Sequence, residues 1–471
     1  MPDVRWSALD HVIAGDVVLP GSEAYEAEPK SFNARFHDLL PQAVVRCATP
    51  EDVAETVSFV RHYGLQAVPR SGGHCFAGRS STHGVVVDVS PMGSVAVSGD
   101  RATIGAGARL GPVYQSLDGV GLAIPGGTCP SVGIAGLTLG GGLGILGRSY
   151  GVTSDRLVSA QVVLADERIV DCDDERHDDL FWALRGAGAA NFGVVTSLTF
   201  RTVPATAATN LHLAWPHTKA GAVINAWQRW APTGPDQLAA SLKLTTSADL
   251  NAPPSVDVYL ALFDGDADAA DLVDQLVAAV GSESVSTTGG SMSFTDTRRF
   301  WARLGVECDE VPPDPLAPVP RYLFAKSEFF RRPLPAEAIE SLVGVWLRGR
   351  IAGETRELDF SPWGGAYNRR PRQATAFPHR DELFQLKHAA VVAPAASAPE
   401  TRAAQRWVNE SWESVHPWAS GRVFQNFADP DLDGWETAYY GPNYARLTQI
   451  KRRYDPDELF RFPQSLPAAS P

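Results

Sequence analysis

The sequence has few cysteines and no cluster of positive charge, and both absences exclude classes of protein. Its 471 residues include five cysteines, which are scattered and form no Cys-x-x-Cys pair. We therefore expect neither a disulfide framework nor a metal site. No run of lysines and arginines is present and the formal net charge is −13, so we expect no nucleic-acid partner.

The sequence also lacks a segment suited to crossing a membrane. The first residues, MPDVRWSALDHV, carry charges throughout and no apolar core, so we expect no secretory signal, a cytoplasmic protein and no membrane partner. Residues 119–147 carry no charge, but they include Pro125, Pro130 and many glycines. Such a segment does not form a continuous lipid-facing helix, and we interpret it as buried loop and sheet.

Two glycine-rich stretches stand out from the rest of the chain. Residues 68–74 read VPRSGGH and residues 125–133 read PGGTCPSVG. Each places one nucleophilic side chain, His74 or Cys129, on a backbone that glycine loosens and proline fixes. Main-chain N–H groups in such loops can approach a ligand closely. Either stretch alone is more typical of packing than of chemistry, but the pair predicts a ligand site.

The first of these stretches ends a predicted strand–helix–strand unit. Residues 44–47 and 65–69 have the composition of strands, and residues 49–64 that of a helix with Thr49 as N-cap and Gly64 as its end. Ligand loops in open α/β units leave the ends of strands in this way. Further predicted elements are strands at 84–89, 95–98 and 102–105 and a helix at 110–118.

Residues 142–147 match the G-x-G-x-x-G fingerprint of nicotinamide-dinucleotide enzymes, and Asp166 follows at a suitable distance. That fingerprint requires a helix to begin at the glycines. Residues 148–155 instead look like a turn, and residues 164–170 look like a hairpin. A dinucleotide-binding dehydrogenase is therefore disfavoured.

The length suggests two or three domains, and the pattern of predicted secondary structure changes near Pro204. Predicted strands at 211–215, 238–245, 256–262 and 322–330 alternate with predicted helices at 220–230, 268–280, 336–347 and 399–415. This pattern predicts a second α+β domain in which helices cover an antiparallel sheet. The C-terminal segment resembles the first part of the chain in composition, and it includes a predicted charged helix at 445–453.

Several longer motifs in a fixed order give the chain a family resemblance. They are RSGGH at 70–74, GGTCPSVGIAG at 126–136, LGGGLGILGRSYGVTSD at 139–155, FWALRGAGAANFGVVT at 181–196, FPHR at 377–380, YYGPN at 439–443 and RRYDPDELF at 452–460. With these motifs the chain resembles berberine-bridge-enzyme-like flavin oxidases of the vanillyl-alcohol-oxidase superfamily. The resemblance implies a two-part PCMH-type FAD-binding domain, residues 1–204 and 422–471, around a substrate-binding domain, residues 205–421.

The resemblance also implies how the cofactor is held. The flavin of FAD would be bonded through its 8α-methyl group to His74 and through C6 to the sulfur of Cys129. Glycine loops would aim N–H groups at the pyrophosphate, since the chain has no P-loop lysine motif. The other residues expected to bind the cofactor are Arg70, Ser71, Gly72, Gly73, Gly133, Gly136, Gly140, Gly141, Gly142, Asn191, Gly193, Val195, Tyr440 and Asn443.

In this family the residue three positions after the attachment cysteine controls the access of oxygen to the flavin, and valine there accompanies oxidase behaviour. The residue here is Val132. We therefore expect dioxygen as the electron acceptor, hydrogen peroxide as a product, and a monomer or homodimer acting on a small molecule.

The chain departs from the family in its catalytic base. Many relatives have Tyr-x-Asn-Tyr where this chain has Phe424-Gln425-Asn426-Phe427, and phenylalanine cannot accept a proton. A desolvated Lys387 is one candidate replacement, although a solvated strand lysine is the ordinary alternative. The other candidates, each also explicable as a structural residue, are Tyr367, Tyr150 and His388.

The leading hypothesis is an FAD-dependent oxidase that moves a hydride from a small organic molecule, such as a specialised metabolite, to flavin N5. A sugar oxidase that produces a lactone is the first alternative. A flavin-bearing protein that binds a ligand without turnover is the second. His379 and Arg380 are expected to hold the fold rather than to catalyse.

Overall fold

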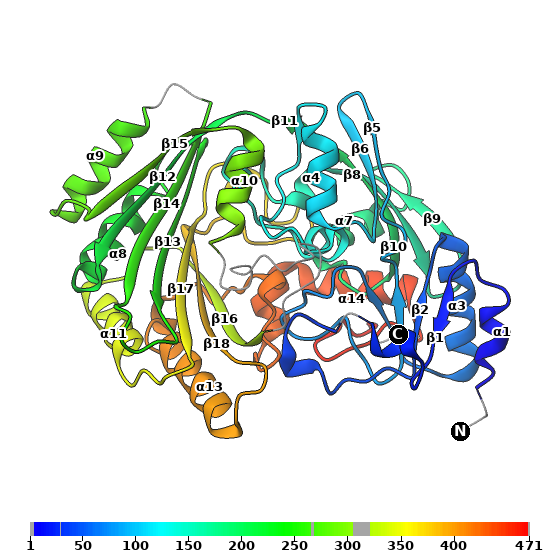
Figure 1. The fold of residues 1–471 in the computed structure, drawn as a ribbon. Helices are drawn as coiled ribbons and strands as arrows, with labels where there is room; N and C mark the ends of the chain where they lie inside the picture. Colours follow the sequence, from blue (N-terminus) through cyan, green and yellow to red (C-terminus); the bar gives the residue numbers. More distant parts are fainter. Residues whose placement is uncertain (1–3, 29, 265–267, 305–320, 470–471) are drawn as a thin grey trace.

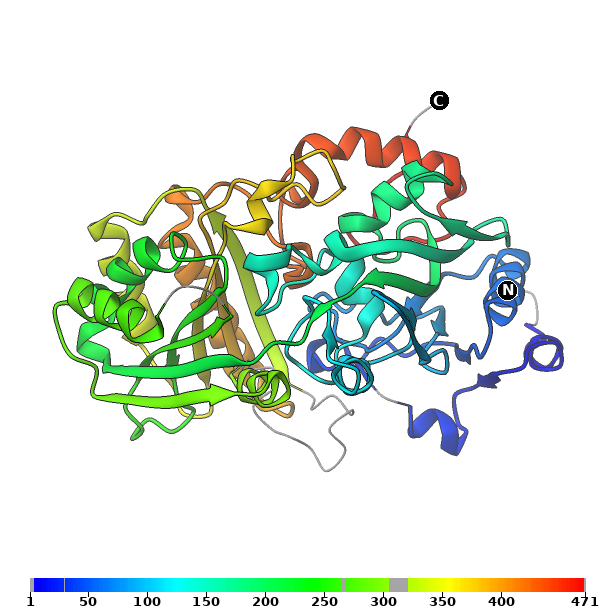
Figure 2. The ribbon, with the colours of Figure 1, turned by 90° about the horizontal axis from the view of Figure 1, so that it is seen from above.

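The computed structural model describes residues 4–28, 30–264, 268–304 and 321–469. Its elements form two lobes that lie side by side (Figures 1 and 2). One lobe is built on a seven-stranded sheet, and the other contains the N-terminal part of the chain. The C-terminal helix α14 (Tyr444–Tyr454) returns to the N-terminal lobe, where Lys451 Nζ donates a hydrogen bond of 2.7 Å to the carbonyl oxygen of Asn191.

A four-stranded sheet begins the N-terminal lobe. Its order is β1 (Asp16–Val18), β2 (Ala43–Arg46), β4 (Val85–Asp88) and β3 (Ala67–Arg70). Helix α3 (Pro50–Tyr63) joins β2 to β3, and both strands pair with β4 in parallel. The predicted strand–helix–strand unit is confirmed, with β4 inserted between its two strands. Local chemistry fixes α3, since Thr49 and Asp52 form a capping box and Gly64 ends the helix at φ 65°.

A five-stranded antiparallel sheet completes this lobe, in the order β5 (Val95–Ser98), β6 (Arg101–Gly105), β10 (Gly193–Arg201), β8 (Leu157–Leu164) and β9 (Ile169–Cys172). Strands β8 and β9 form the predicted hairpin. The expectation of a turn after the fingerprint glycines is wrong in detail, because α6 (Gly147–Tyr150) is a four-residue helix there. That helix is too short to serve a pyrophosphate as a dinucleotide-binding helix does.

The other lobe is organised around the seven-stranded sheet, whose strands are all antiparallel to their neighbours. Its order is β15 (Ser286–Met292), β12 (Ala208–Pro216), β14 (Ser255–Phe263), β13 (Leu238–Thr246), β17 (Thr355–Pro362), β18 (Phe384–Val392) and β16 (Tyr322–Phe330). Four helices cover one face of this sheet (Figure 1): α8 (Ala220–Trp230), α9 (Ala269–Val280), α11 (Ala336–Leu347) and α13 (Ala398–Glu413).

The predicted α+β architecture is therefore confirmed for this lobe, including its four covering helices. The sequence patterns do not predict β15, which is exposed and contains Gly289 and Gly290, or β17, whose charged residues hide its strand character. The remaining helices and strands are α1 (Trp6–Asp10), α2 (Glu23–Glu26), α4 (Leu110–Asp118), β7 (Leu122–Ala123), α5 (Ile134–Leu139), α7 (Asp178–Ala187), β11 (Val203–Pro204), α10 (Phe294–Ala302) and α12 (Ala366–Arg369).

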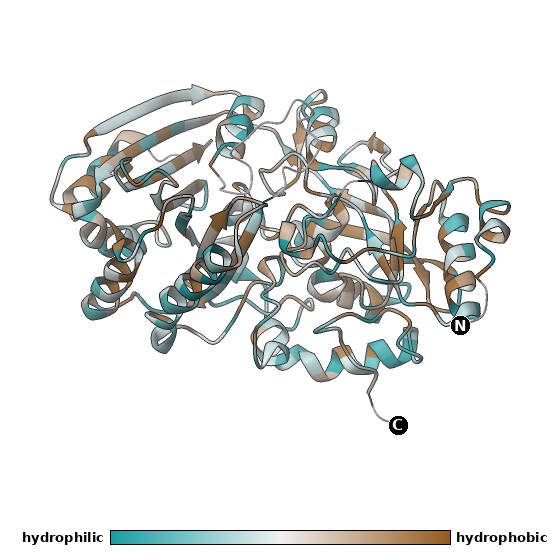
Figure 3. Ribbon diagram, turned by 60° about the horizontal axis from the view of Figure 1, so that its bottom comes forward, coloured by the Kyte–Doolittle hydropathy of each residue, from teal (hydrophilic) through white to brown (hydrophobic). Residues whose placement is uncertain are grey.

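Each lobe buries its own hydrophobic core. The larger core joins side chains from the first 200 residues with Val423, Leu447, Ile450 and Phe460 from the end of the chain. The second core lies between the seven-stranded sheet and its helices. Figure 3 shows apolar residues concentrated on the strands and on the inner sides of the helices. No helix in the described part of the chain has the length and apolar character needed to cross a membrane.

Candidate active site

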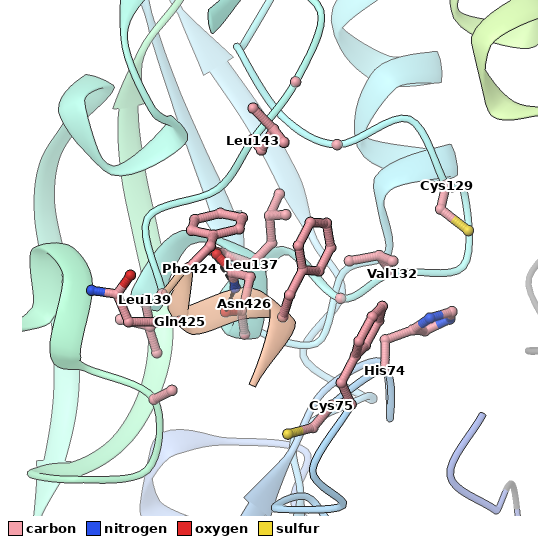
Figure 4. Close-up of a pocket in the computed structure, with 18 of the residues that line it drawn as sticks. His74, Cys75, Cys129, Val132, Leu137, Leu139, Leu143, Phe424, Gln425 and Asn426 are labelled. Carbon is pink, nitrogen blue, oxygen red and sulfur yellow. Dashed lines mark hydrogen bonds between the residues drawn. The ribbon is translucent and has the colours of Figure 1, made fainter. Parts of the chain in front are cut away.

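A cavity of about 360 Å³ lies between the two lobes. The N-terminal lobe contributes the loops at 69–76 and 127–145. The sheet lobe contributes the uncovered face of β13 and β17, and residues 424–427 form a third wall. Figure 4 shows side chains of the two N-terminal loops and of residues 424–426 converging on one space. The tertiary fold therefore brings together the glycine-rich stretches that the sequence singles out.

His74 and Cys129 both line this cavity, and both lie beside Ser131. His74 Nε2 is 2.9 Å from Ser131 Oγ, and Cys129 Sγ is 4.0 Å from the same oxygen. The His74 ring also stacks on Phe32, with ring centroids 4.9 Å apart. Val132 lies between His74 and Cys129 along this wall (Figure 4). The two nucleophilic side chains are thus held in one place by loops distant in the sequence.

The cysteines differ in their surroundings. Cys129 is disulfide-bonded in this structure, so any other bond at its sulfur requires the reduced cysteine. Cys75 lines the cavity as a free thiol, and its side chain points away from that of His74 (Figure 4). Burial raises the pKa of Cys47 and of Cys172 to about 12, so these two thiols are inert packing residues.

Glycine allows the two loops to touch through their backbones. A Cβ atom on Gly72 would lie 2.2 Å from the backbone nitrogen of Gly133, a contact that no side chain permits. A Cβ atom on Gly73, where φ is +71°, or on Gly136 would meet nothing within 4 Å. These two glycines therefore leave main chain open to the cavity. A wall of this kind fits a dinucleotide cofactor whose pyrophosphate needs close backbone N–H groups.

Most of the residues predicted to bind the cofactor do line the cavity. They are Arg70, Ser71, Gly72, Gly73, His74, Cys129, Gly133, Gly136, Gly140, Gly193, Val195 and Tyr440. Within the part of the chain that the structure describes, the lining does not include four others, which are Gly141, Gly142, Asn191 and Asn443.

Those four residues hold chain segments together instead. Asn191 Oδ1 accepts the Leu466 N–H at 3.0 Å, and Asn443 Nδ2 donates to the Thr375 carbonyl oxygen at 3.1 Å. The Gly142 N–H donates to Asn426 Oδ1 at 3.0 Å. A Cβ atom on Gly141 would lie 2.7 Å from the Phe377 ring. These contacts do not test binding of the cofactor, so the expectation that the four residues bind it stays a prediction.

The sheet wall of the cavity carries a buried cluster of two lysines and two carboxylates, which we call the charged quartet (Lys243, Glu357, Asp359 and Lys387). Lys243 Nζ lies 3.0 Å from Glu357 Oε2 and 3.1 Å from Asp359 Oδ2. Lys387 Nζ lies 3.3 Å from Glu357 Oε1 and 3.6 Å from Asp359 Oδ2. Ser241 Oγ donates to Asp359 Oδ1 at 2.9 Å. Each buried charge is thus compensated inside the quartet.

Two opposing effects act on the carboxyl group of Asp359. Burial raises its pKa, but the ammonium groups of Lys243 and Lys387 and the hydrogen bonds from Lys243 and Ser241 hold the pKa below its usual range. Asp359 is therefore ionised at neutral pH. Among the described residues the cavity lining includes Lys243 and Asp359 but neither Lys387 nor Glu357. The lysine that reaches the cavity is thus Lys243 rather than the predicted Lys387.

The three other candidate bases, Tyr367, Tyr150 and His388, lie in three different environments. Tyr367 lines the cavity, but its hydroxyl donates to the Gly144 carbonyl oxygen at 3.2 Å and burial raises its pKa. Tyr150 is absent from the lining among described residues; the Arg156 guanidinium lies 6.0 Å from its ring centroid. His388 Nδ1 is 2.8 Å from Ser411 Oγ of α13, on the helix-covered face of the sheet, and burial lowers its pKa to about 3.

The segment that replaces Tyr-x-Asn-Tyr lies against the cavity. The Phe427 ring centroid is 5.2 Å from that of Phe424 and 5.2 Å from that of Phe76. Lys387 Nζ lies 5.2 Å from the centroid of the Phe427 ring. Asn426 Nδ2 donates to the Gly136 carbonyl oxygen at 3.1 Å and so ties this segment to the second glycine stretch. The lost phenols are thus replaced by an aromatic, apolar wall.

Sequence reasoning did not identify Ser131, Ser241, Lys243 or Asp359 as site residues. The last three follow a readable signal, because polar residues occupy every second position from Ser241 to Thr245 and from Thr355 to Ser361. Alternation of this kind predicts a strand with one polar face. Ser131 carries no such signal, since its importance depends on the approach of His74 from a distant loop.

Comparison with known proteins gives this arrangement a family. Residues 41–173 match the family described as "FAD binding domain", and residues 423–467 match the family "Berberine and berberine like". The FAD-linked oxidoreductase YgaK of Bacillus subtilis (strain 168) is 31% identical over 466 residues, which cover 97% of each chain. The chain belongs to the berberine-bridge-enzyme-like FAD-linked oxidoreductases. Berberine bridge enzyme-like 5 of Arabidopsis thaliana is 30% identical over 467 residues, 92% of this chain and 86% of that protein.

Solved structures of this family share the whole fold. Wild-type BBE-like 1 of Physcomitrella patens superposes with a TM-score of 0.88 at 25% identity over 99% of this chain and 100% of that one. A chitooligosaccharide oxidase superposes with a TM-score of 0.86 at 27% identity over 99% of both chains. The 6-hydroxy-D-nicotine oxidase of Arthrobacter nicotinovorans gives 0.82 at 26% identity over 96% and 98%.

As a berberine-bridge-enzyme-like oxidoreductase, the chain uses FAD, and the cavity is where its residues fit that cofactor. The open main chain at Gly73 and Gly136 faces the cavity from the N-terminal lobe. Lys243 and Asp359 of the charged quartet line it from the sheet lobe, and Phe424 and Phe427 line its third wall. When bound, FAD supplies a two-electron acceptor, and the protein supplies binding, orientation and local charge.

Proposed function

We propose that this chain is an FAD-dependent oxidase that takes a hydride from a small organic substrate and passes the electrons to dioxygen, with hydrogen peroxide as a product. The observation that carries the proposal is the convergence of His74 and Cys129 on one cavity, both beside Ser131. In the family these two positions bond the flavin at its 8α-methyl group and at C6. We extend that double attachment to this chain, with Cys129 in its reduced form.

The position of Val132 supports dioxygen as the acceptor. Val132 lines the cavity between His74 and Cys129 (Figure 4). Its side chain is small, so it leaves more room beside an attached flavin than a larger side chain would. Valine at this position accompanies oxidase behaviour in the family. Hydrogen peroxide produced in stoichiometric amounts with oxidised substrate is the expected result.

The apolar wall supports a specialised metabolite as the substrate. Phe76, Phe424 and Phe427 present aromatic surface where a sugar would need hydrogen-bonding groups. A sugar oxidase is the second candidate, because the fold is similar to that of a chitooligosaccharide oxidase. A protein that carries flavin and binds a ligand without turnover is the third, because both phenols are missing.

Acid precipitation of the purified full chain tests the cofactor part of the proposal. We expect a yellow pellet whose intact mass exceeds that of the polypeptide by one FAD. His74→Ala and Cys129→Ala should each keep one attachment, and the double variant should release the colour into the supernatant. Cys75→Ala is the matched control, because Cys75 lines the same cavity beside His74. A colourless protein would overturn the proposal.

A peroxide assay tests the reaction. Sugars, amines, phenols and benzylic alcohols are offered separately to the flavin-bearing protein in air. Peroxide from an aromatic alcohol, phenol or amine supports the leading proposal, and peroxide from a sugar supports the second candidate. Bound flavin that no member of the panel reduces under anaerobic conditions supports the third.

A further inference from the structure

Charged side chains of alternating sign cross the cavity face of the seven-stranded sheet in one row. Asp257 of β14, Lys243 of β13, Asp359 of β17 and Lys387 of β18 lie directly opposite one another in the strand register. Side chains of a strand alternate between its two faces. The neighbours of these residues, such as Leu242, pack toward the helices, so the whole row points away from the helices.

Exposure separates the members of the charged quartet. The side chains of Lys387 and Glu357 are 2% and 3% exposed, whereas those of Lys243 and Asp359 are 8% and 16% exposed. Lys243, Asp359 and Ser241 also line the cavity. The buried half of the quartet therefore holds the other half in place. A ligand meets one ammonium donor and one carboxylate acceptor, 3.1 Å apart.

The rest of the cavity around this pair is largely apolar. Phe76, Leu143, Trp301, Phe424 and Phe427 all line it. The quartet itself carries two positive and two negative charges, which cancel. A charged group placed at this pair would lose its hydration without gaining a net counter-charge from the quartet. An uncharged hydroxyl can instead donate to the carboxylate and accept from the ammonium group.

We propose that Lys243 and Asp359 bind the hydroxyl group of an uncharged, largely apolar substrate, and that Asp359 accepts the hydroxyl proton as the adjoining carbon is oxidised to a carbonyl. This inference rests on the proposed function for its oxidant. The C–H bond breaks and its electron pair leaves as hydride to the oxidised flavin. The O–H bond breaks, its electron pair forms the C=O bond, and the proton moves to Asp359.

Each member of the pair has a distinct role in this step. Asp359 is ionised, and among the described residues its Oδ1 accepts one hydrogen bond, from Ser241, so a lone pair remains for the substrate. The Lys243 ammonium group stabilises negative charge that develops on the substrate oxygen. Lys387 and Glu357 are positioning residues, because they act through Lys243 and Asp359. With Asp359 as the proton acceptor, the reaction does not require a phenol at the positions of Phe424 and Phe427.

Ligand binding tests the hydroxyl site without turnover. The probe is 4-nitrophenol, whose absorbance reports its ionisation, and its methyl ether 4-nitroanisole is the comparison ligand. We expect the full chain to bind the phenol about tenfold more tightly than the ether. The bound phenol should show the spectrum of its un-ionised form, because the carboxylate of Asp359, whose pKa lies below its usual range, leaves the proton on the phenol. Lys243→Met and Asp359→Asn should each abolish this preference.

Two matched variants control the binding test. Asp257→Asn changes an aspartate of the same row, whose carboxylate bonds His212 Nε2 at 2.7 Å. Lys326→Met changes a lysine of the same sheet that pairs with Asp429 at 2.5 Å. Both should keep the preference for the phenol. If Lys243→Met fails to fold, two other variants replace it: Ser241→Ala, and the double variant Lys243→Met/Asp359→Asn, which removes one charge of each sign. Both should weaken the preference for the phenol.

The catalytic part is measured as anaerobic reduction of the bound flavin by the best hydroxyl substrate of the peroxide panel. Asp359→Asn should slow this reduction by about 10²–10⁴-fold, the usual contribution of a general base, which exceeds the roughly tenfold loss of affinity expected from the binding test. A preference for the phenol that survives in both Lys243→Met and Asp359→Asn would overturn the proposal, as would its loss in Asp257→Asn. A purified protein that carries no flavin would instead overturn the proposed function. It would leave the hydroxyl site open to test, because the phenol-binding assay does not require flavin.

Discussion

The guanidinium of Arg380 donates two parallel hydrogen bonds to the carboxylate of Asp155, with Nη1–Oδ2 at 2.7 Å and Nη2–Oδ1 at 2.8 Å. The two side chains are 1% and 2% exposed. Asp155 lies in the N-terminal lobe and Arg380 lies just before β18 of the other lobe. This buried pair therefore joins the two lobes beside the cavity, in agreement with the expectation that Arg380 holds the fold.

Breaking this pair should destabilise the protein strongly. Asp155→Asn leaves the Arg380 charge buried without its partner, which costs about 3–5 kcal/mol of unfolding free energy. Urea denaturation of the two proteins measures the difference. Asp166→Asn is the control, because Asp166 pairs with Arg168 at 51% and 59% exposure and should change stability by less than about 1 kcal/mol. Equal losses in the two variants would contradict this assignment.

Removal of the Ser131 hydroxyl should slow attachment of the flavin at His74. Ser131 Oγ is 2.9 Å from His74 Nε2 and orients the ring. A hydrogen bond of this kind contributes about 1 kcal/mol, so we expect Ser131→Ala to slow attachment by about fivefold. The measurement follows covalent flavin in acid-precipitated protein after FAD is added to the apoprotein. Ser361→Ala, on the opposite cavity wall, should attach flavin at the normal rate.

Gly136 and Gly72 should respond differently to a methyl group. A Cβ atom on Gly136 meets no protein atom within 4 Å and points into the cavity, whereas one on Gly72 would lie 2.2 Å from the Gly133 nitrogen. Gly136→Ala should keep or slightly raise the melting temperature, since Gly136 is in helix α5, and should lower the FAD content. Gly72→Ala should lower the melting temperature. Full FAD occupancy in Gly136→Ala would contradict a cofactor contact there.

The pair of Glu328 and His416 should make stability depend on pH. Burial raises the pKa of Glu328 from 4.5 to about 7, and its hydrogen bond to His416 raises the pKa of that histidine. Because the folded protein holds both protons more tightly than the unfolded chain does, stability falls as pH rises from about 4.5 through 7.

Denaturation midpoints across this pH range measure the effect. The part due to Glu328 is roughly 2–3 kcal/mol, and Glu328→Gln should remove most of it because the amide stays neutral. His416→Gln should remove a smaller part, since His416 is more exposed than Glu328. An identical pH dependence in the wild type and in Glu328→Gln would contradict this origin.

Much of the architecture could be predicted from local sequence. Helix α3 begins at the predicted proline after Thr49 and ends before Gly64, because capping chemistry depends only on neighbouring residues. The helices of the sheet lobe follow from their apolar periodicity in the same way. The edge strand β15 escapes this reasoning, since its glycines give no strand pattern and only pairing with β12 orders it.

The sequence by itself determined the family, the nucleophiles His74 and Cys129, and the loss of two phenols at Phe424 and Phe427, because residue type and spacing carry those features. Only the tertiary structure decided which charged side chains line the cavity. Lys243 and Asp359 are distant in the chain and become partners through strand register. A shift of one residue would turn either side chain toward the helices. The identity of neither residue predicts its partner, because cross-strand pairing is a property of the assembled sheet.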